Sequence, residues 1–541
     1  MKTDIRKRDG LARSGTFTIG DNMIPFPAAI DTDRVFPALA IQKYMNVPLA
    51  APPDFVSRYL EQPKSPVIIH PALGNSAKSG DCVMAANWHT VMENPRQYVE
   101  YLVGLKEKTP PDTLWYAPAS ALPGNVHILC YSGFDLFDYT WIDLKTAQRK
   151  FCTTEGEFPT TAIDEMACGC EGCRTGDLKL HNRLALDREL ATIRTFIAKG
   201  QLRELVESRC RLSAPHVAIL RDLDSRYAFA ERTAPVVRGG ILRANSAESM
   251  TRPEIRRFME RVAVRYIPPK ADVAVLLPCS ARKPYSLSQS HRRFRQAIGG
   301  RAHELIVTSP LGLVPRELET VYPAMHYDVP VTGYWDAEEC SVISSVIATY
   351  LRKHHYRHVI AHLEGGALEV AEAAADIAGT TLEYSCRENP TGSDALNKLD
   401  NALAGERKVR DDRLHGILSF QFGVDIDTRG LSVRGTFPEL FWSRDRVPYF
   451  SLDTTGGIIR PTFDGWSLIP DGYRVEIDDF VPEGDILVPG IVRTDPAIRE
   501  GDEVLVTGPR AVATGRAAMS GDEMERSNRG VAVRVRKVKK V

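Results

Sequence analysis

Residues 272–291 read DVAVLLPCSARKPYSLSQSH, and this stretch decides how the middle of the chain is interpreted. After Asp272 the chain continues through a run of apolar residues, which predicts a strand buried on both faces. A polar loop with a thiol, an amine and several hydroxyl groups follows, before a helix that carries Phe294. Ligands bind at the carboxyl ends of strands in open parallel sheets, so this loop is a candidate active site.

The sequence on either side repeats an alternation of strand and helix. A helix is predicted over residues 248–266, with Thr251 as its N-cap and Pro253 in its first turn. Strand patterns at HELIVTSP and HVIAHL alternate with helix patterns at CSVISSVIATYLRKHH and ALEVAEAAADIAG. This order is typical of a parallel sheet, and it predicts a doubly wound α/β domain over residues 250–390.

Length and composition indicate the number of domains and the broad class of protein. A chain of 541 residues is expected to form three or four domains, and 43% hydrophobic with 26% charged residues is ordinary for a globular protein. We find no apolar run near the roughly 20 residues that span a bilayer and no signal peptide, so a cytoplasmic location without a membrane is expected. The net charge is zero, so any charge that binds nucleic acid must be concentrated in patches.

The two ends of the chain carry different patterns. Residues 113–143 alternate short apolar runs with Pro and Gly, and residues 181–212 show apolar residues at helical spacing, which predicts an α/β domain over 1–245. Beyond residue 390, short strand-like stretches are separated by Gly, Pro and Asp. They predict a small α+β domain over 391–470 and a small β-barrel over 471–541.

Three of the ten cysteines lie close together, and a histidine follows them. Cys168, Cys170, Cys173 and His181 form the pattern C-x-C-x2-C-x7-H, which suits tetrahedral Zn²⁺. Four protein ligands leave no open position for water, so the predicted site is structural. The alternative is a group of reduced thiols beside an unrelated histidine.

The sequence around this cluster resembles the zinc-binding end of tRNA-guanine transglycosylases. The resemblance covers CGCEGC and the following LKLHNRLALDRELATIRTFIAKGQLRELVE, and upstream YSGFDLFDY puts Asp138 in the place of the nucleophilic aspartate of that family. However, the Asp-Ser-Gly-Gly-Phe type segment of the family is not found, and too few residues precede Asp138 for a complete eight-unit barrel of about 250 residues. We therefore expect a shortened TIM-barrel-like domain, in which Asp138 is a structural or RNA-contacting residue rather than a working nucleophile.

The middle of the chain resembles the central domain of archaeosine synthases. The segments that carry the resemblance are PCSARKPYSLSQSH, SPLGLVPRELETVYP and YDVPVTGYWD. It implies a fold related to uracil-DNA glycosylase, and an activity that adds an amine to the nitrile of 7-cyano-7-deazaguanine in the D-arm of tRNA. Lysine is the implied donor, with glutamine or ammonia as alternatives, and a separate radical SAM enzyme is implied to finish the product.

The polar loop supplies the catalytic candidates. A thiolate of Cys279 is expected to add to the nitrile carbon if Lys283 or His291 lowers its pKa. Each residue also has a simpler interpretation: a buried cysteine at a strand end, a lysine that binds phosphate together with Arg282, a histidine that caps its helix. The full set of catalytic candidates is Cys279, Ser280, Lys283, Tyr285 and His291.

From residue 473 to the end, the chain resembles a PUA domain throughout its length. Its last strand carries basic residues suited to RNA phosphates, although a solvated terminal strand would carry such residues too. The RNA-binding candidates are Arg534, Arg536, Lys537 and Lys539.

Three hypotheses about function follow. The amidine-forming synthase explains the loop, the shortened barrel and the RNA module together, so we prefer it. The alternatives are an active transglycosylase that exchanges the base, and a noncatalytic subunit that binds tRNA. A homodimer is expected only by analogy with transglycosylases.

Overall fold

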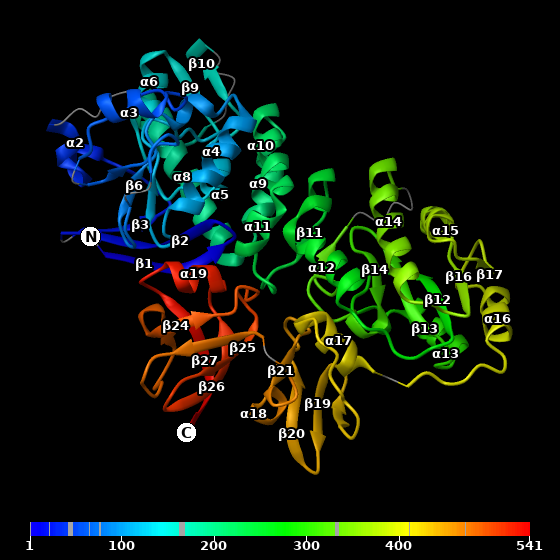
Figure 1. The fold of residues 1–541 in the computed structure, drawn as a ribbon. Coiled ribbons are helices and arrows are strands. Elements are labelled where there is room, and N and C mark those ends of the chain that lie inside the picture. Colours follow the sequence, from blue (N-terminus) through cyan, green and yellow to red (C-terminus); the bar gives the residue numbers. More distant parts are fainter. Residues whose placement is uncertain are drawn as a thin grey trace.

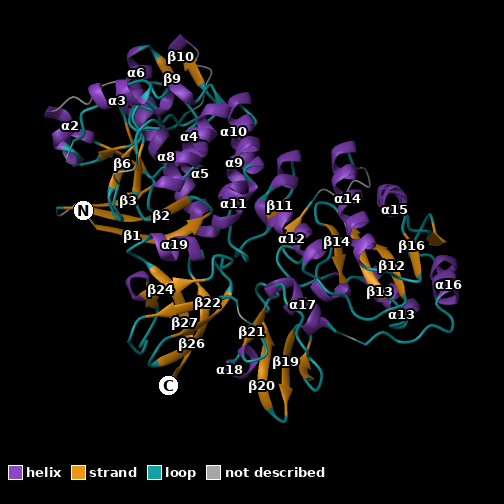
Figure 2. Cartoon of the chain, in the orientation of Figure 1, coloured by secondary structure: helices purple, strands orange, loops and turns teal. Residues whose placement is uncertain are grey.

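The computed structural model describes residues 2–20, 22–41, 47–63, 65–74, 77–161, 168–329, 335–410, 412–470 and 472–541. The chain forms four units (Figure 1), with the N-terminal unit in blue and cyan above the C-terminal unit in red, and the central unit in green beside them. The small unit, in yellow and orange, lies below the central one. Helices and strands alternate in the N-terminal and central units, whereas strands predominate in the other two (Figure 2).

The N-terminal unit contains two sheets. Strands β1 (Lys2–Asp9), β2 (Ala12–Ile19) and β3 (Asn22–Phe26) form an antiparallel sheet. A second, parallel sheet has the order β4-β8-β7-β6-β5, so its first strand lies beside its last. These strands are β4 (Ala28–Ile30), β5 (Val67–Ile68), β6 (Cys82–Met84), β7 (Leu114–Tyr116) and β8 (Leu136–Asp138).

Helices cover this sheet and close the unit. In α8 (Leu178–Lys199), Leu186, Leu190, Ile193 and Ile197 recur at helical spacing and are buried, which confirms the predicted amphipathic pattern. The other helices are α1 (Thr32–Val35), α2 (Pro37–Ile41), α3 (Pro53–Tyr59), α4 (Pro95–Lys108), α5 (Val126–Tyr131), α6 (Thr140–Ala147), α7 (Glu171–Thr175), α9 (Leu202–Cys210), α10 (Ala214–Ser225) and α11 (Tyr227–Thr233). A hairpin of β9 (Lys150–Cys152) and β10 (Glu157–Pro159) lies between α6 and α7.

The central unit is built on a five-stranded sheet with the order β14-β13-β12-β16-β17. All neighbours are parallel except β14, which runs antiparallel to β13. Apolar side chains of α13 and α16 pack on one face, and α12, α14 and α15 pack with the other core, so helices cover both faces as expected of a doubly wound sheet. The strands are β12 (Val273–Pro278), β13 (His303–Thr308), β14 (Gly312–Pro315), β16 (His358–His362) and β17 (Leu382–Cys386). The helices are α12 (Pro253–Val264), α13 (Gln289–Ile298), α14 (Ala337–Lys353), α15 (Gly365–Ala378) and α16 (Ser393–Ala402).

The start of this unit differs from the prediction. Helix α12 begins at Pro253 with Arg252 as its N-cap residue, and a 3-10 turn over Ala247–Thr251 precedes it. The Thr251 hydroxyl donates to Asp224 at 2.7 Å, so it does not cap α12. Arg252 is 2% exposed and pairs with Glu204 at 2.7 Å and with Glu207 at 2.8 Å. These buried ion pairs join the central unit to α9 of the N-terminal unit.

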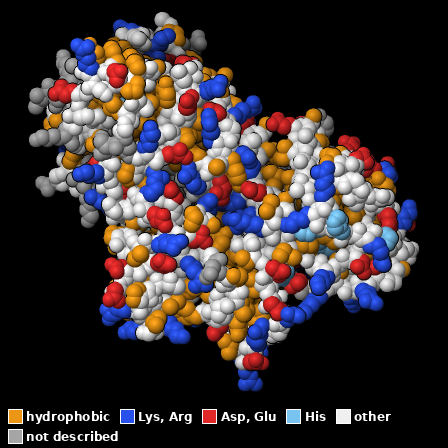
Figure 3. Space-filling view, viewed as in Figure 1, with side chains coloured by type: hydrophobic (Ala, Val, Ile, Leu, Met, Phe, Trp, Pro, Cys, Tyr) orange, Lys and Arg blue, Asp and Glu red, His pale blue; other side chains and the backbone are white. Residues whose placement is uncertain are grey.

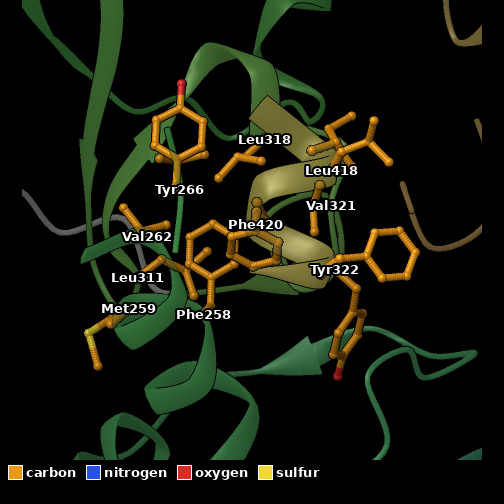
Figure 4. Close-up of a cluster of buried hydrophobic side chains, with 14 of the residues drawn as sticks. Phe258, Met259, Val262, Tyr266, Leu311, Leu318, Val321, Tyr322, Leu418 and Phe420 are labelled. Atoms are coloured by element: carbon orange, nitrogen blue, oxygen red, sulfur yellow. The ribbon is translucent and has the colours of Figure 1, made fainter. Parts of the chain in front are cut away.

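The small unit shares a core with the central one. Helix α17 (Arg413–Phe422) places Leu418 and Phe420 against Phe258 and Val262 of α12 (Figure 4). Its antiparallel sheet has the order β18-β19-β20-β21. The remaining elements are β18 (Ser432–Thr436), β19 (Glu439–Arg444), β20 (Val447–Leu452), β21 (Ile459–Pro461) and α18 (Phe463–Trp466).

The C-terminal unit is a six-stranded sheet with the order β23-β27-β26-β25-β22-β24. It docks on the N-terminal unit, where Arg526 of α19 (Gly521–Arg526) donates to the carbonyl oxygens of Glu107 at 2.8 Å and Thr109 at 2.9 Å. Arg499 pairs with Glu231 at 2.7 Å. The strands are β22 (Arg474–Ile477), β23 (Ile486–Leu487), β24 (Ile491–Thr494), β25 (Glu503–Thr507), β26 (Ala511–Ala517) and β27 (Val531–Lys540).

The structure bears on two expectations about the whole chain, one about membrane-spanning helices and one about the distribution of charge. Among the described helices, none combines the length and apolar composition needed to cross a bilayer. Basic and acidic side chains are interspersed over the face in view (Figure 3), in keeping with the zero net charge.

Candidate active site and metal centre

A cavity of about 530 Å³ opens at the carboxyl ends of the central strands. Pro278 and Cys279 line it from the end of β12, Ser309 from the end of β13, and Glu364 from the junction of β16 and α15. The position agrees with the rule that parallel sheets bind ligands at this edge. The Cys279 thiol is therefore part of a cavity wall, where a bound molecule can reach it.

Two further segments complete the cavity. The short strand β11 (Leu242–Arg243) pairs in parallel with β15 (Tyr327–Asp328) and brings residues 244–250 over the opening. The start of α14 supplies Trp335 and Glu339, and the Ser309 hydroxyl donates a hydrogen bond to the Glu339 carboxylate. A thiol, a hydroxyl and a carboxylate thus share one hollow. The expected YDVPVTGYWD loop is described only in part, because residues 330–334 lie outside the described residues.

Two of the predicted catalytic residues, Lys283 and Ser280, lie in the loop that follows the strand ending before Cys279. The ammonium nitrogen of Lys283 lies 3.8 Å from the centre of the Tyr327 ring, in a cation–π contact. Burial lowers the pKa of Lys283, while the nearby Cys279 and Asp328 oppose this change. The Ser280 hydroxyl donates to the carbonyl oxygen of Arg282 at 2.9 Å, which shapes the loop.

Tyr285 and His291 lie beneath the loop, where both are fully buried. The Tyr285 hydroxyl is 2.7 Å from that of Tyr327, which in turn is 2.6 Å from the Thr308 hydroxyl. Burial and the Arg316 cation lower the pKa of His291 to about 3. His291 is therefore neutral at neutral pH, and its Nδ1 accepts a hydrogen bond from Arg316 at 2.8 Å. Of the two candidates for stabilising a Cys279 thiolate, the neutral His291 is unsuitable, which leaves Lys283.

A buried ion network supports the loop from below. Arg316 pairs with Glu304, and with Glu319 at 3.0 Å. Glu319 also accepts the backbone N–H of Ser286 at 2.8 Å, within the loop itself. Arg413 of the small unit reaches the same carboxylate at 3.4 Å. The small unit therefore helps to hold the loop that follows Cys279.

Replacing Arg316 by alanine should destabilise the protein strongly, because the Glu304 and Glu319 carboxylates would stay buried without this partner. Breaking one side of a buried ion pair costs about 3–5 kcal/mol. The change is measured as a shift of the urea unfolding midpoint of the full chain. Arg429→Ala is the control, since the Asp427–Arg429 pair is exposed and should leave the midpoint unchanged. Equal midpoints for the two variants would contradict the role of the network.

The four predicted metal ligands come together in the N-terminal unit. The ligand atoms of Cys168, Cys170, Cys173 and His181 all lie within 4.8 Å of one another. The three sulfur atoms are 3.6, 3.2 and 3.3 Å from Nδ1 of His181. Zinc with Zn–S bonds of about 2.3 Å and a Zn–N bond of about 2.0 Å in a tetrahedron sets a sulfur–nitrogen separation of about 3.5 Å. The observed distances fit this requirement.

The surroundings orient the histidine for such a role. Nε2 of His181 lies 3.1 Å from the carbonyl oxygen of Cys152, so this nitrogen carries the proton and leaves Nδ1 free to bind a metal. The Phe151 ring stacks on the imidazole at 3.7 Å between centroids. Gly172 is needed at the turn, because a Cβ atom there would lie 2.3 Å from the backbone nitrogen of His181.

The Asp138 carboxylate is hydrogen-bonded to neighbouring groups of the protein. It lies at the end of β8 and is 5% exposed. One carboxylate oxygen accepts the Tyr116 hydroxyl at 2.8 Å, and the other accepts the backbone N–H groups of Ala119 and Thr140, both at 3.0 Å. The Asp138 carboxylate therefore accepts three hydrogen bonds from the protein itself.

The basic residues of the C-terminal strand β27 have different surroundings. Arg534, Arg536, Lys537 and Lys539 are all exposed. Arg536 forms an ion pair with the buried Glu503 carboxylate. Within the described residues, the other three form no ion pair, so their charges face solvent.

Sequence reasoning missed several residues of the cavity. Ser309 lies at the end of one predicted strand and Glu364 directly follows another, so the rule that located Cys279 would have located them too. Glu339 directly precedes the predicted helix that begins at Cys340, and it carries no such signal. Residues 244–250 reach the cavity through a two-residue strand pairing, which no sequence pattern indicates.

Two parts of the chain match known protein families. Residues 255–403 match a family described as a domain of unknown function (DUF5591), and residues 473–539 match the PUA domain family. A mixed α/β chain with a C-terminal PUA domain therefore falls in the class of RNA-binding proteins.

The relatives identify the family more closely. The archaeosine synthase subunit alpha of Methanosarcina acetivorans is 39% identical, over 84% of this chain and 79% of that protein. The archaeosine synthase of Haloferax volcanii is 34% identical, over 99% of both chains. The chain belongs to the archaeosine synthase family. AF0587, a solved protein of unknown function, is 31% identical, and its match covers 52% of this chain and 100% of that one with a TM-score of 0.46; tRNA-guanine(15) transglycosylases also match, at lower identity.

Proposed function

We propose that this protein modifies tRNA by adding an amine to the nitrile of 7-cyano-7-deazaguanine in the D-arm, which forms an amidine. The observation that carries the proposal is the Cys279 thiol in the wall of a cavity at the carboxyl ends of the central strands. The volume of about 530 Å³ lies within the range of small-molecule sites, and it would admit a heterocyclic base together with part of a donor. Family membership agrees with the proposal.

In the proposed reaction, the Cys279 thiolate adds to the electrophilic nitrile carbon, and the nitrile nitrogen takes a proton to give a thioimidate. The donor amine then adds to the same carbon, and the carbon–sulfur bond breaks to release the thiolate and leave the amidine. No electrons are exchanged with an outside reagent. The Lys283 ammonium favours the thiolate, because a nearby positive charge stabilises it.

Other residues take supporting roles in this proposal. Glu339, held by Ser309, accepts the proton that the donor nitrogen loses as it attacks. Ser280, Tyr285 and His291 shape and anchor the loop and do not contact the substrate. Lysine remains the proposed donor, and a radical SAM enzyme remains the proposed partner that acts next.

We also propose fold relationships for the N-terminal and central units. The hydrogen bonding of β4 to β8, the first and last strands of the parallel sheet, favours a shortened TIM-like barrel, since such barrels close first strand to last. The central sheet remains a candidate relative of uracil-DNA glycosylase. The Cys and His cluster is proposed to bind structural Zn²⁺.

The reaction is tested by supplying purified protein and tRNA carrying the cyano-deazaguanine with lysine, glutamine or ammonium separately, and following the nucleoside mass. The proposal expects a gain equal to one donor, or the mass of the amidine. Release of free base would instead favour a transglycosylase, although the engaged Asp138 argues against one. An unchanged nucleoside mass together with tight tRNA binding would favour the hypothesis of a noncatalytic subunit.

A further inference from the structure

A second hollow lies beside the cavity and has a different lining. It follows the carboxyl end of β17 and includes Arg387 and Lys398, with a volume of about 520 Å³. The two hollows meet at Glu364, which lines the cavity and accepts the backbone N–H of Asn389, a residue of the second hollow, at 2.8 Å. The two hollows are therefore neighbours.

Helix α13 extends this lining with arginines. Phe294 and Ile298 point into the core with Leu399 of α16, so the two helices lie side by side on one face of the sheet. Arg292 and Arg293 therefore face solvent near the start of α13, immediately after the loop that contains Cys279. Nη1 of Arg293 donates to the carbonyl oxygen of Thr391 at 3.3 Å, which places this arginine against the rim of the second hollow.

Most of these cations form no ion pair within the described residues. Arg387 pairs with Glu372 at 3.0 Å, and Glu388 and Asp394 also line the hollow. In the parts of the chain that the structure describes, Arg292, Arg293 and Lys398 form no ion pair. We define the α13–α16 basic surface as Arg292, Arg293, Arg387 and Lys398.

We propose that the α13–α16 basic surface binds the phosphates that flank the target nucleotide of tRNA, while the base itself enters the cavity lined by Cys279. An enzyme that acts on a base in a folded RNA must take it out of its stack, and the flanking backbone then needs a cationic contact close to the base site. Glu339 and Glu364 form an acidic wall of the cavity, which repels phosphate. This repulsion confines the RNA backbone to the α13–α16 basic surface. The inference rests on the proposed function and locates a contact separate from the PUA domain.

The test compares the triple variant Arg292→Ala, Arg293→Ala and Lys398→Ala with the wild type in binding an unmodified tRNA transcript at several salt concentrations. Binding should weaken about 10- to 100-fold at 0.1 M salt, and the slope of log affinity against log salt should fall by about 2–3, one unit for each lost phosphate contact. The control is Lys270→Ala, Arg352→Ala and Arg357→Ala, three exposed cations near the opposite, amino ends of the central strands, of which Arg357 pairs with Glu406. It should bind within about twofold of the wild type, since these residues lie far from the cavity edge.

Binding that is unchanged in affinity and slope would overturn the inference, even if amidine formation were demonstrated. Conversely, if the triple variant binds weakly and Cys279→Ala retains full amidine formation, the basic surface stands and the thiol mechanism fails. Exposed substitutions normally change stability little. If the triple variant were unstable, Arg292→Ala with Lys398→Ala would serve, with a slope reduced by about 1–2.

Discussion

Replacing Cys279 by serine is expected to reduce amidine formation on tRNA by a factor of about 1000 or more, because a hydroxyl does not replace a thiolate as the attacking group. The affinity for tRNA should be unchanged, since the substitution alters one atom in a cavity wall. Both quantities are measured on the full chain, the first by nucleoside mass and the second by filter binding. The loss should therefore appear in the chemical step alone.

Cys386→Ser provides a matched control for this variant. Cys386 also lies at the carboxyl end of a strand in the same sheet, but burial and the Glu364 carboxylate raise its pKa to about 11, so it stays a thiol. The control should keep full activity. Retention of more than about a tenth of the wild-type rate by Cys279→Ser would rule out the covalent thioimidate.

Loss of a metal ligand should have the second largest effect. Cys170→Ser removes one of the four converging ligands, and it also removes the sulfur that accepts the backbone N–H of Cys173 at 3.3 Å. Structural zinc contributes about 10–16 kcal/mol of binding free energy in small zinc peptides, so we expect loss of bound zinc and unfolding of residues 168–177. Metal analysis of the purified wild type should give about one zinc per chain.

The control here is again Cys386→Ser, which lies outside the cluster and should retain the metal. A strong chelator added to the wild type should release zinc and increase proteolysis near residues 168–181, which tests the site even if the variant does not fold. A wild-type protein purified without zinc, with an unchanged unfolding temperature after chelation, would contradict the assignment.

Local sequence patterns predicted the parts of this protein that depend on neighbours along the chain. The run from Val273 to Pro278 is apolar because β12 lies between strands and under helices, and the helical spacing of α8 reflects one buried face. The Cys and His cluster was predictable because its members lie within fourteen residues of one another. The position of Cys279 followed from the rule for strand ends.

Long-range packing decided what the sequence did not predict. Thr251 looks like a helix cap, yet a buried ion network draws Arg252 inward and moves the start of α12. Helix α16 packs on the central sheet through Leu399 and Leu403, although residue 390 was the predicted end of that unit. Tyr285 and His291 resemble catalytic residues in sequence, and only the fold shows that both are buried.

The docking of the C-terminal unit through Arg526 and the buried pairs of Arg252 connect the C-terminal, N-terminal and central units in one continuous body. These contacts set the separation between strand β27, which is predicted to bind RNA, and the cavity lined by Cys279. Under the proposed function, a tRNA bound at β27 would present to the cavity only a nucleotide that lies at that separation. Selection of the modified position would then depend on the shape of the folded tRNA more than on the letters around the base.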